Sequence, residues 1–485
     1  MTQPTQPSPP PQPGRPGTPP GASAGAAPGG PAGAAQPSEA QKLRELLRTP
    51  GYLKTLLFCG LIGIPVSLAA FWFLAGLQQL QRLVWTDLPH ALGHDSPPWW
   101  LPLPLLLVSG ICVGQIVTRF PGAGGHVPAS GLHPGGATAA ALPGVVLAAA
   151  FSLPLGATLG PEAPLIALGG GLAIAFRHLT GTPETPMSTA LLGAAGSAAA
   201  ISAIFGNPLI AAILLMEVAG VGGLQLFAIM LPALLASGIG SLVFTGFGRW
   251  TGLGTGTLAL KSGTDFPRLD AGDVVWGILI GAVLGAAMTL VQRGGRMTAV
   301  RVARRPLTMT ALCGIAAGVC AAAYTLGTGR SPVDVASSGQ ATLAELAKDP
   351  HAWGVGALIA VLLCKGAAFS LCLGSLRGGP IFPSLFLGAA AGVLLSPLPG
   401  LGVGAGLAAG LAATTTAALR LPVSSVLLVV LVLGSTATMP VAILSSVVAF
   451  VISGLLPAGP AVPPIGRMPR TAAPDPPATP APPAA

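Results

Sequence analysis

Charged residues are scarce in this sequence: Asp, Glu, Lys and Arg together make up 8% of its 485 residues, whereas soluble domains carry roughly 25%. Hydrophobic residues make up 52%, and the mean hydropathy is +0.75. This composition excludes an ordinary soluble enzyme and indicates an integral membrane protein. The apolar runs are continuous, whereas the strands of a membrane β-barrel alternate apolar and polar residues. We therefore expect an all-α protein that crosses the membrane several times.

Aromatic residues are also few, at 5%, whereas glycine is abundant, at 69 residues. Small residues let helices approach closely in lipid, so this balance predicts tightly packed helices. The six cysteines lie in apolar segments without metal-ligand spacing. We expect buried, inert thiols and no metal or cofactor. The net charge of +9 is modest, and its positive residues flank apolar segments, which indicates membrane topology and not nucleic-acid binding.

Composition divides the chain into two membrane halves with polar ends. Residues 1–38 and 457–485 are rich in proline, glycine and alanine, so we expect disordered tails. The halves cover residues 39–247 and 273–456, and a polar linker at 248–272 separates them. No cleavable signal peptide is expected, because the first apolar run starts too late.

Positive residues predict the orientation of the spans. Four of them precede or open the first span, from about Leu53 to Leu80, which predicts a cytoplasmic N-terminus for a protein of the plasma membrane (the cell inner membrane): Lys42, Arg44, Arg48 and Lys54. A later span, from about Val274 to Val291, is followed by the densest positive segment. We interpret it as a cytoplasmic loop: Arg293, Arg296, Arg301, Arg304 and Arg305.

One carboxylate, Glu162, lies between long apolar segments, in the run Gly160-Pro161-Glu162-Ala163-Pro164. A charged side chain at membrane depth costs at least about 2.5 kcal/mol. Prolines are tolerated in the first turn of a helix, so the run predicts a helix N-terminus. Helix N-termini attract anions. Glu162 is therefore predicted to occupy an anion site when charged and to leave it when protonated.

The second half repeats the first in outline. Pro164 and Pro383 are each followed by Leu-Gly at the same spacing. Asn207-Pro208 and Leu421-Pro422 each open an apolar helix, at a similar offset. Because the first half begins in the cytoplasm and the first long span of the second half ends there, we expect an inverted repeat of broken helices.

These motifs together resemble the CLC family of chloride channels and chloride–proton antiporters, over roughly residues 50–456. The Glu162 run is similar to the family's Gly-Arg-Glu-Gly-Pro motif. Gly378 to Leu385 resembles its Gly-x-Phe-x-Pro motif, and Gly124-Gly125-His126-Val127-Pro128 falls where the family has Gly-Ser-Gly-Ile-Pro. The resemblance implies a homodimer in the lipid bilayer, with one pathway per subunit for an inorganic anion, chloride being the first expectation, and with protons as an alternative second substrate.

The resemblance also implies the site. Glu162 takes the position of the gating glutamate, and we expect helix N-termini at Gly125, Glu162 and Ile381–Phe382 to converge on the anion. Pro380 lacks an N–H group and cannot donate. The expected anion-binding residues are Gly124, Gly125, His126, Gly160, Pro161, Ala163, Ile381, Phe382, Ser435 and Thr436.

Two departures from the family pattern leave selectivity and coupling open. Gly125 replaces the central serine, and residues 434–438 lack the family tyrosine, so Ser435, Thr436 or Thr438 would have to supply a hydroxyl and the anion need not be chloride. Val218 stands at the position of the antiporters' internal proton-transfer glutamate, directly after Glu217. We place passive conduction first and keep antiport through water or Glu217 as the alternative.

Further alternatives concern single residues and the function class. Glu217 is interpreted first as a buried structural acid, whereas His126, Lys365 and Arg377 each allow either an anion-related or a structural role. A membrane-embedded enzyme would need paired His, Asp or Ser constellations within spans, and the histidines show no such pattern. We therefore predict that the protein is not an enzyme. A non-transporting scaffold remains the last alternative.

Overall fold

The described part of the computed structural model folds mainly into helices, and eight of these are long and apolar enough to cross a membrane. The only β-type pairing among the described residues is an isolated bridge between Gly160 and Gly379. The predicted all-α, polytopic architecture is confirmed. The described residues are 39–133, 137–179, 185–220, 223–253 and 271–463.

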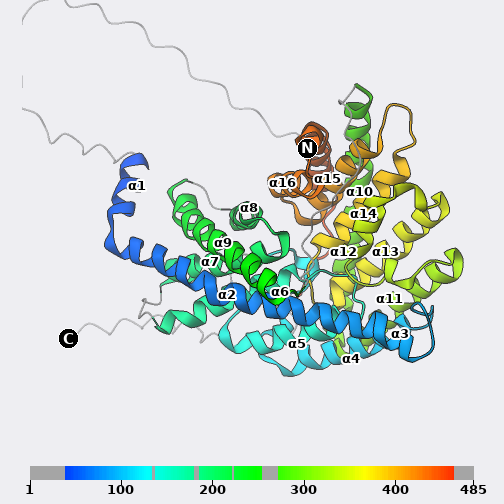
Figure 1. Cartoon of the computed structure of the whole chain (residues 1–485), viewed down its shortest axis with the longest axis horizontal. Helices are drawn as coiled ribbons and strands as arrows, with labels where there is room; N and C mark the ends of the chain where they lie inside the picture. Colours follow the sequence, from blue (N-terminus) through cyan, green and yellow to red (C-terminus); the bar gives the residue numbers. More distant parts are fainter. Residues whose placement is uncertain (1–38, 134–136, 180–184, 221–222, 254–270, 464–485) are drawn as a thin grey trace, which may run out of the picture.

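The predicted tail at 1–38, most of the linker and the end of the second tail lie outside these residues. The α-helices of the first half, coloured blue to green in Figure 1, are α1 Glu39–Arg48, α2 Pro50–Arg82, α3 Leu88–Ala91, α4 Pro102–Arg119, α5 Leu142–Ser152, α6 Glu162–Ala175, α7 Pro186–Phe205, α8 Pro208–Ala219 and α9 Gly223–Thr251. Those of the second half are α10 Ala271–Arg304, α11 Pro306–Thr328, α12 Gln340–Lys348, α13 Val355–Ser375, α14 Ile381–Leu395, α15 Val403–Leu419, α16 Pro422–Leu433 and α17 Met439–Leu455.

The two halves pack in the same way. In the first half α6 packs on α7, α7 on α9, and α9 on α2; in the second half α14 packs on α15, α15 on α17, and α17 on α10. The two halves meet along α4 and α11, among other contacts. Equivalent helices thus make equivalent contacts, which agrees with the internal repeat expected from the two proline-led motifs.

Glycines set the closest helix contacts in both halves. A Cβ added at Gly169 of α6 would overlap the backbone of Gly196 in α7, and one at Gly388 of α14 would overlap Gly410 in α15. Larger residues at these positions would push the helices apart, as expected for interfaces between membrane helices. These contacts fix the positions at which α6 and α14 begin.

The arginine-rich segment is helical and does not form the loop that the sequence predicts. Arg293, Arg296, Arg301 and Arg304 lie on α10, which continues to Arg304, and Arg305 then caps α11. Arginine is a good helix former, and its long stem can carry the charge past an apolar boundary. The positive charge therefore lies along the last turns of a long helix instead of in a loop.

Candidate functional site

The N-termini of α6 and α14 meet at a short backbone pairing. Gly160 donates its N–H group to the carbonyl of Gly379 at 2.8 Å, and Gly379 donates back to Gly160. Pro161 and Pro380 then occupy the N-cap positions of α6 and α14. Two segments separated by half of the chain thus place two helix N-termini, with their positive dipole ends, beside each other.

The Glu162 side chain fills the space between these N-termini. Its Oε1 accepts a hydrogen bond of 2.9 Å from the backbone N–H of Phe382, and the side chain is completely buried. The amides of Ile381 and of Glu162 itself also interact with the carboxylate. Oε2 has no hydrogen-bond partner among the described residues. The carboxylate is therefore held on one side by amides that suit an anion, and on the other side by none.

Two glycines make room for this carboxylate. A Cβ added at Gly160 or Gly379 would overlap the carboxylate oxygens of Glu162. The ring of Phe382 lies 6.2 Å from the ring of Phe205, at an angle of 24°, and closes the apolar side of the site. Glycine is thus required at the paired backbone positions because the site has no space for larger residues.

The glycine loop after α4 does not form the helix start that the sequence predicted. Gly124 and Gly125 have φ angles of 68° and 96°, and the following helical segment is only the 3-10 turn Pro128–Ser130. Positive φ angles favour glycine and interrupt a right-handed helix. The expectation that an α-helix N-terminus at Gly125 faces the anion is therefore wrong.

Arg377 connects this loop to the start of α14. Its Nε donates to the carbonyl of Ala123 at 3.3 Å and its Nη1 to that of Leu376 at 3.2 Å. Nη2 is buried and has no hydrogen-bond partner among the described residues. His126 is exposed beside the loop, and its ring stacks on His133 with 4.4 Å between centroids. Arg377 thus carries an unpaired, buried N–H group close to the predicted anion loop.

The predicted hydroxyl donors do not contact Glu162. Ser435 Oγ accepts from the N–H of Ala437 at 3.3 Å and caps the turn before α17, while Thr436 is exposed. The buried Thr438 donates to the carbonyl of Ser435 at 3.0 Å. No hydrogen bond among the described residues joins these three side chains to α6 or α14.

Glu217 caps a different helix. Its Oε1 accepts from the N–H of Val423 at 3.0 Å, and its Oε2 accepts from the N–H and the hydroxyl of Ser424 at 2.7 and 2.6 Å. Both oxygens are thus used to hold the N-terminus of α16. This geometry matches the structural interpretation of Glu217.

Lys365 has a structural geometry as well. Its Nζ is completely buried and donates to the carbonyls of Asp334, Val335 and Ser337 at 3.0, 3.1 and 3.2 Å. An ammonium group has three N–H donors, so all of them are used. Thr158 donates to Val335 in turn, at 3.2 Å. Lys365 therefore fixes the loop that lies behind the Gly160 segment.

A family of known sequences matches the part of the chain that contains this site. The family description "Voltage gated chloride channel" matches residues 110–454, which include both helix N-termini. The chain belongs to this CLC family. A relative described as "Putative ion-transport protein YfeO", from Salmonella newport (strain SL254), is 28% identical over 342 residues, which cover 69% of this chain and 78% of YfeO.

Solved structures share the CLC fold. A slow cyanobacterial Cl⁻/H⁺ antiporter matches with a TM-score of 0.67 and 20% identity, over 84% of this chain and 95% of that one. A CLC-type fluoride/proton antiporter matches with a TM-score of 0.63 and 21% identity, over 84% and 96%. A eukaryotic CLC transporter has a TM-score of 0.59 at 18% identity, covering 85% and 73%. These likenesses support the architecture expected for CLC proteins.

A polar cavity beside the N-terminus of α6 carries no signal in the sequence. It has a volume of about 40 Å³ and is lined by Pro161 and Leu159 next to Glu162. Gln78 and Gln81 from the end of α2 and Ser338 add uncharged polar groups. Glutamines at the end of an apolar helix form no motif, so only the fold reveals that they share a cavity with Pro161, the residue before Glu162.

Proposed function

We propose that this protein conducts an inorganic anion across the membrane through a path that the Glu162 carboxylate blocks. The observation that carries this proposal is the hydrogen bond from the Phe382 N–H to Glu162, at the point where two helix N-termini meet. The carboxylate occupies a place that is electrostatically suited to an anion. Charged, it competes with the transported anion; protonated, it loses that advantage and can leave.

The path has polar groups on one side of the block. The glutamine-lined cavity beside Pro161 supplies amide groups where an anion would approach Glu162. We infer that Arg377, through its unpaired Nη2, partly replaces the hydroxyl that the family has at Gly125. Chloride is the first expectation, and a smaller halide such as fluoride is the alternative. The homodimer and the cytoplasmic N-terminus remain predictions from the resemblance and from the positive residues.

Passive conduction is the first form of this proposal, because Val218 cannot carry a proton and both oxygens of Glu217 already hold α16. Proton-coupled antiport is the second form. It is favoured by the two structural relatives described as Cl⁻/H⁺ and fluoride/proton antiporters. Antiport would require protons to reach Glu162 through water or another acid.

The test is anion efflux from liposomes containing the purified protein, with external pH recorded simultaneously. We expect chloride or fluoride to leave faster at low pH, and Glu162→Ala to remove this pH dependence. Its charge-assisted bond stabilises the blocked state by about 1.5–3 kcal/mol, so the variant's flux at neutral pH should rise roughly tenfold or more. Glu345→Gln, an exposed carboxylate on α12, is the matched control.

The outcomes separate the two forms. Efflux without proton movement supports passive conduction, whereas opposite proton movement supports antiport. Unchanged pH dependence in Glu162→Ala would contradict the gating mechanism. A protein that carries none of the tested anions would contradict anion transport and leave the scaffold alternative.

A further inference from the structure

A second cavity lies between α10 and the end of α15. Its volume is about 160 Å³, far more than the roughly 10–15 Å³ that one water requires on this measure. Gln292 and Arg296 of α10 line one side, and Ala129 to Leu132 of the glycine loop, Ala417 to Arg420 and Gly459 line the others. Four chain segments thus enclose a space that none of the predicted site residues lines.

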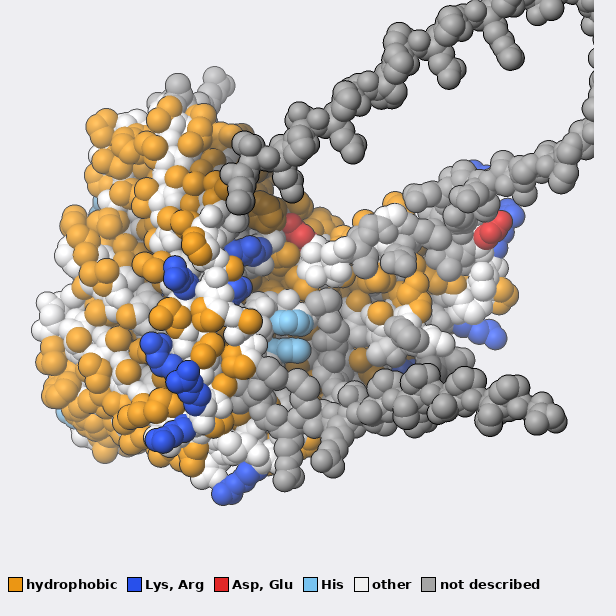
Figure 2. All heavy atoms as spheres, turned by 180° about the vertical axis from the view of Figure 1, so that it is seen from behind, with side chains coloured by type: hydrophobic (Ala, Val, Ile, Leu, Met, Phe, Trp, Pro, Cys, Tyr) orange, Lys and Arg blue, Asp and Glu red, His pale blue; other side chains and the backbone are white. Residues whose placement is uncertain are grey.

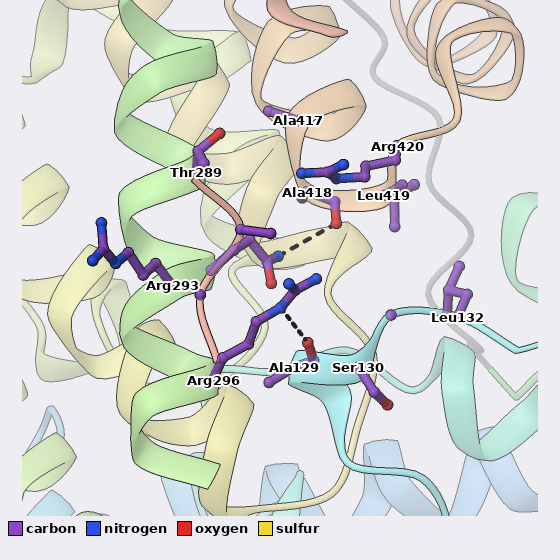
Figure 3. Close-up of a pocket in the computed structure, with 14 residues that line it drawn as sticks. Ala129, Ser130, Leu132, Thr289, Arg293, Arg296, Ala417, Ala418, Leu419 and Arg420 are labelled. Carbon is purple, nitrogen blue, oxygen red and sulfur yellow. Dashed lines mark hydrogen bonds between the residues drawn. The ribbon is translucent and has the colours of Figure 1, made fainter. Parts of the chain in front are cut away.

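Two guanidinium groups are directed into this cavity. Figure 3 shows Arg296 and Arg420 with their guanidinium groups in the space between the two helices, whereas Arg293 lines the cavity but directs its guanidinium group away from it. The two charges repel each other. Among the described residues, no carboxylate forms an ion pair with either arginine; the ion pair found there joins Arg330 and Asp334. The cavity therefore concentrates positive charge without an internal counter-charge.

Backbone carbonyls hold both arginines in place. Arg296 Nε donates to the carbonyl of Ala129 at 3.4 Å, and Arg420 Nη2 donates to that of Ser453 at 3.0 Å. A guanidinium group has five N–H donors, so each arginine keeps several for a ligand. Arg420 itself has a φ angle of 59°, the left-handed conformation that ends α15. The backbone turn thus directs this side chain toward α10.

The donor set favours an oxyanion. The forked guanidinium group matches the geometry of phosphate oxygens, and two of them balance a divalent anion better than a monovalent halide. Gln292 Nε2 donates to the carbonyl of Ala418 at 3.4 Å, and its amide oxygen can only accept a hydrogen bond, so the arginines are the principal ligands. We propose that Arg296 and Arg420 form a binding site for a phosphate group.

One face of the molecule is rich in positive charge. Lys and Arg side chains gather on the face seen in Figure 2, beside a pair of neighbouring histidines, while acidic side chains are sparse there. Arg301 and Arg304 continue along α10 beyond the cavity. By the positive-inside rule this end of α10 is cytoplasmic, where phosphate groups are available both from solutes and from lipids.

Occupancy of the site also has a consequence for transport, and this part rests on the proposed function. The cavity wall at Ala129 and Ser130 directly continues the loop that begins at Gly124. A bound phosphate places negative charge beside this loop, so it repels an anion that approaches from the same side. Phosphate on the cytoplasmic side is therefore expected to slow anion flux.

Equilibrium dialysis with radiolabelled inorganic phosphate tests the site directly. The full-length, detergent-purified protein is compared with Arg296→Gln and Arg420→Gln at constant ionic strength. Each substitution should raise the half-saturating phosphate concentration by roughly tenfold, since it removes a charge-assisted donor. Arg293→Gln is the matched control, because it removes the same charge from the same helix while keeping the side-chain stem, and the guanidinium group that it removes points away from the cavity. It should bind phosphate as the wild type does.

Lysine variants separate charge from geometry and guard against misfolding. Arg296→Lys and Arg420→Lys keep the charge but lose the fork, so they should bind phosphate more weakly than wild type and more tightly than the glutamine variants. Equal weakening by Arg293→Gln would overturn the proposal, and so would full competition by chloride at equal ionic strength. Unchanged binding in both glutamine variants would overturn it as well.

Two further measurements identify the source and the consequence. Nanodiscs containing anionic phospholipid should reduce binding of free phosphate if lipid headgroups occupy the site, whereas unchanged binding would identify a soluble phosphate. Phosphate on the cytoplasmic side should slow efflux through the wild type but not through Arg420→Gln. If the wild type carries no anion, the proposed function fails, while dialysis still decides the phosphate site.

Discussion

Two carboxylates in this molecule each sit at the N-terminus of another helix, yet they are held very differently. Glu217 uses both oxygens and accepts three hydrogen bonds from Val423 and Ser424 of α16. Glu162 uses Oε1 on Phe382 of α14, and its Oε2 has no partner among the described residues. Glu217 is also only half-buried, whereas Glu162 is completely enclosed.

The difference separates a structural cap from a candidate gate. A carboxylate whose oxygens are all paired gains little from moving, and its loss leaves orphaned amides behind. A buried carboxylate with an unpaired oxygen is held less firmly in its charged form, because desolvation opposes the amide bonds. Position at a helix N-terminus is common to both carboxylates, so the unpaired oxygen of Glu162 is what distinguishes the candidate gate from the cap.

Filling the space beside Glu162 should have the largest effect on this comparison. Gly379→Ala adds a Cβ that overlaps Glu162 Oε2 and lies 3.1 Å from the backbone N of Ala163. We expect the carboxylate to be expelled at all pH values, so anion efflux loses its pH dependence. The matched control is Gly354→Ala, where a Cβ meets nothing within 4 Å. Normal pH dependence in Gly379→Ala would show that the carboxylate does not need this space.

Removing the carboxylate of Glu217, the structural cap of α16, should have the second largest effect. Glu217→Ala leaves the amides of Val423 and Ser424 without their acceptor, and we expect a loss of about 2 kcal/mol in unfolding free energy. Thermal unfolding of the purified protein measures this loss. The pH dependence of efflux should persist in the folded variant. Loss of pH dependence would instead place Glu217 on a proton path and support antiport.

Much of the fold was predictable from the sequence, because it follows from local signals. Continuous apolar runs gave the spans, and prolines with glycines marked the starts of α6 and α14 correctly. Glu162 and the amide of Phe382 were also expected together, from the resemblance of their motifs. Gly125 does not begin a helix as the sequence predicts, because its positive φ depends on the loop around it.

The remaining site residues carry no local signal. Arg420 follows a run of alanines and threonines, and Arg296 is one of several arginines in its segment. Their proximity arises from the packing of α10 on α15, which no short motif encodes. The sequence likewise allowed two roles for Lys365. Its three carbonyl partners lie in a loop that precedes it by 28 to 31 residues, so no local pattern reveals them.

The smallest effect is expected at His126, the remaining ionisable group of the predicted anion loop. One part of the His126 ring is exposed, but partial desolvation by the rest of its surroundings, followed by the nearby His133 and Arg377, lowers the pKa of His126 below its ordinary value of 6.5. The ring is therefore neutral at neutral pH and gains a proton only in more acidic solution. His126→Gln should leave efflux unchanged at neutral pH and reduce it only in more acidic solution, where the charged ring would attract anions. Efflux measured across this pH range compares this variant with Glu162→Ala. If His126→Gln loses the pH dependence of efflux near neutral pH, the pH sensor is His126 in the glycine loop and not Glu162 at the paired helix N-termini.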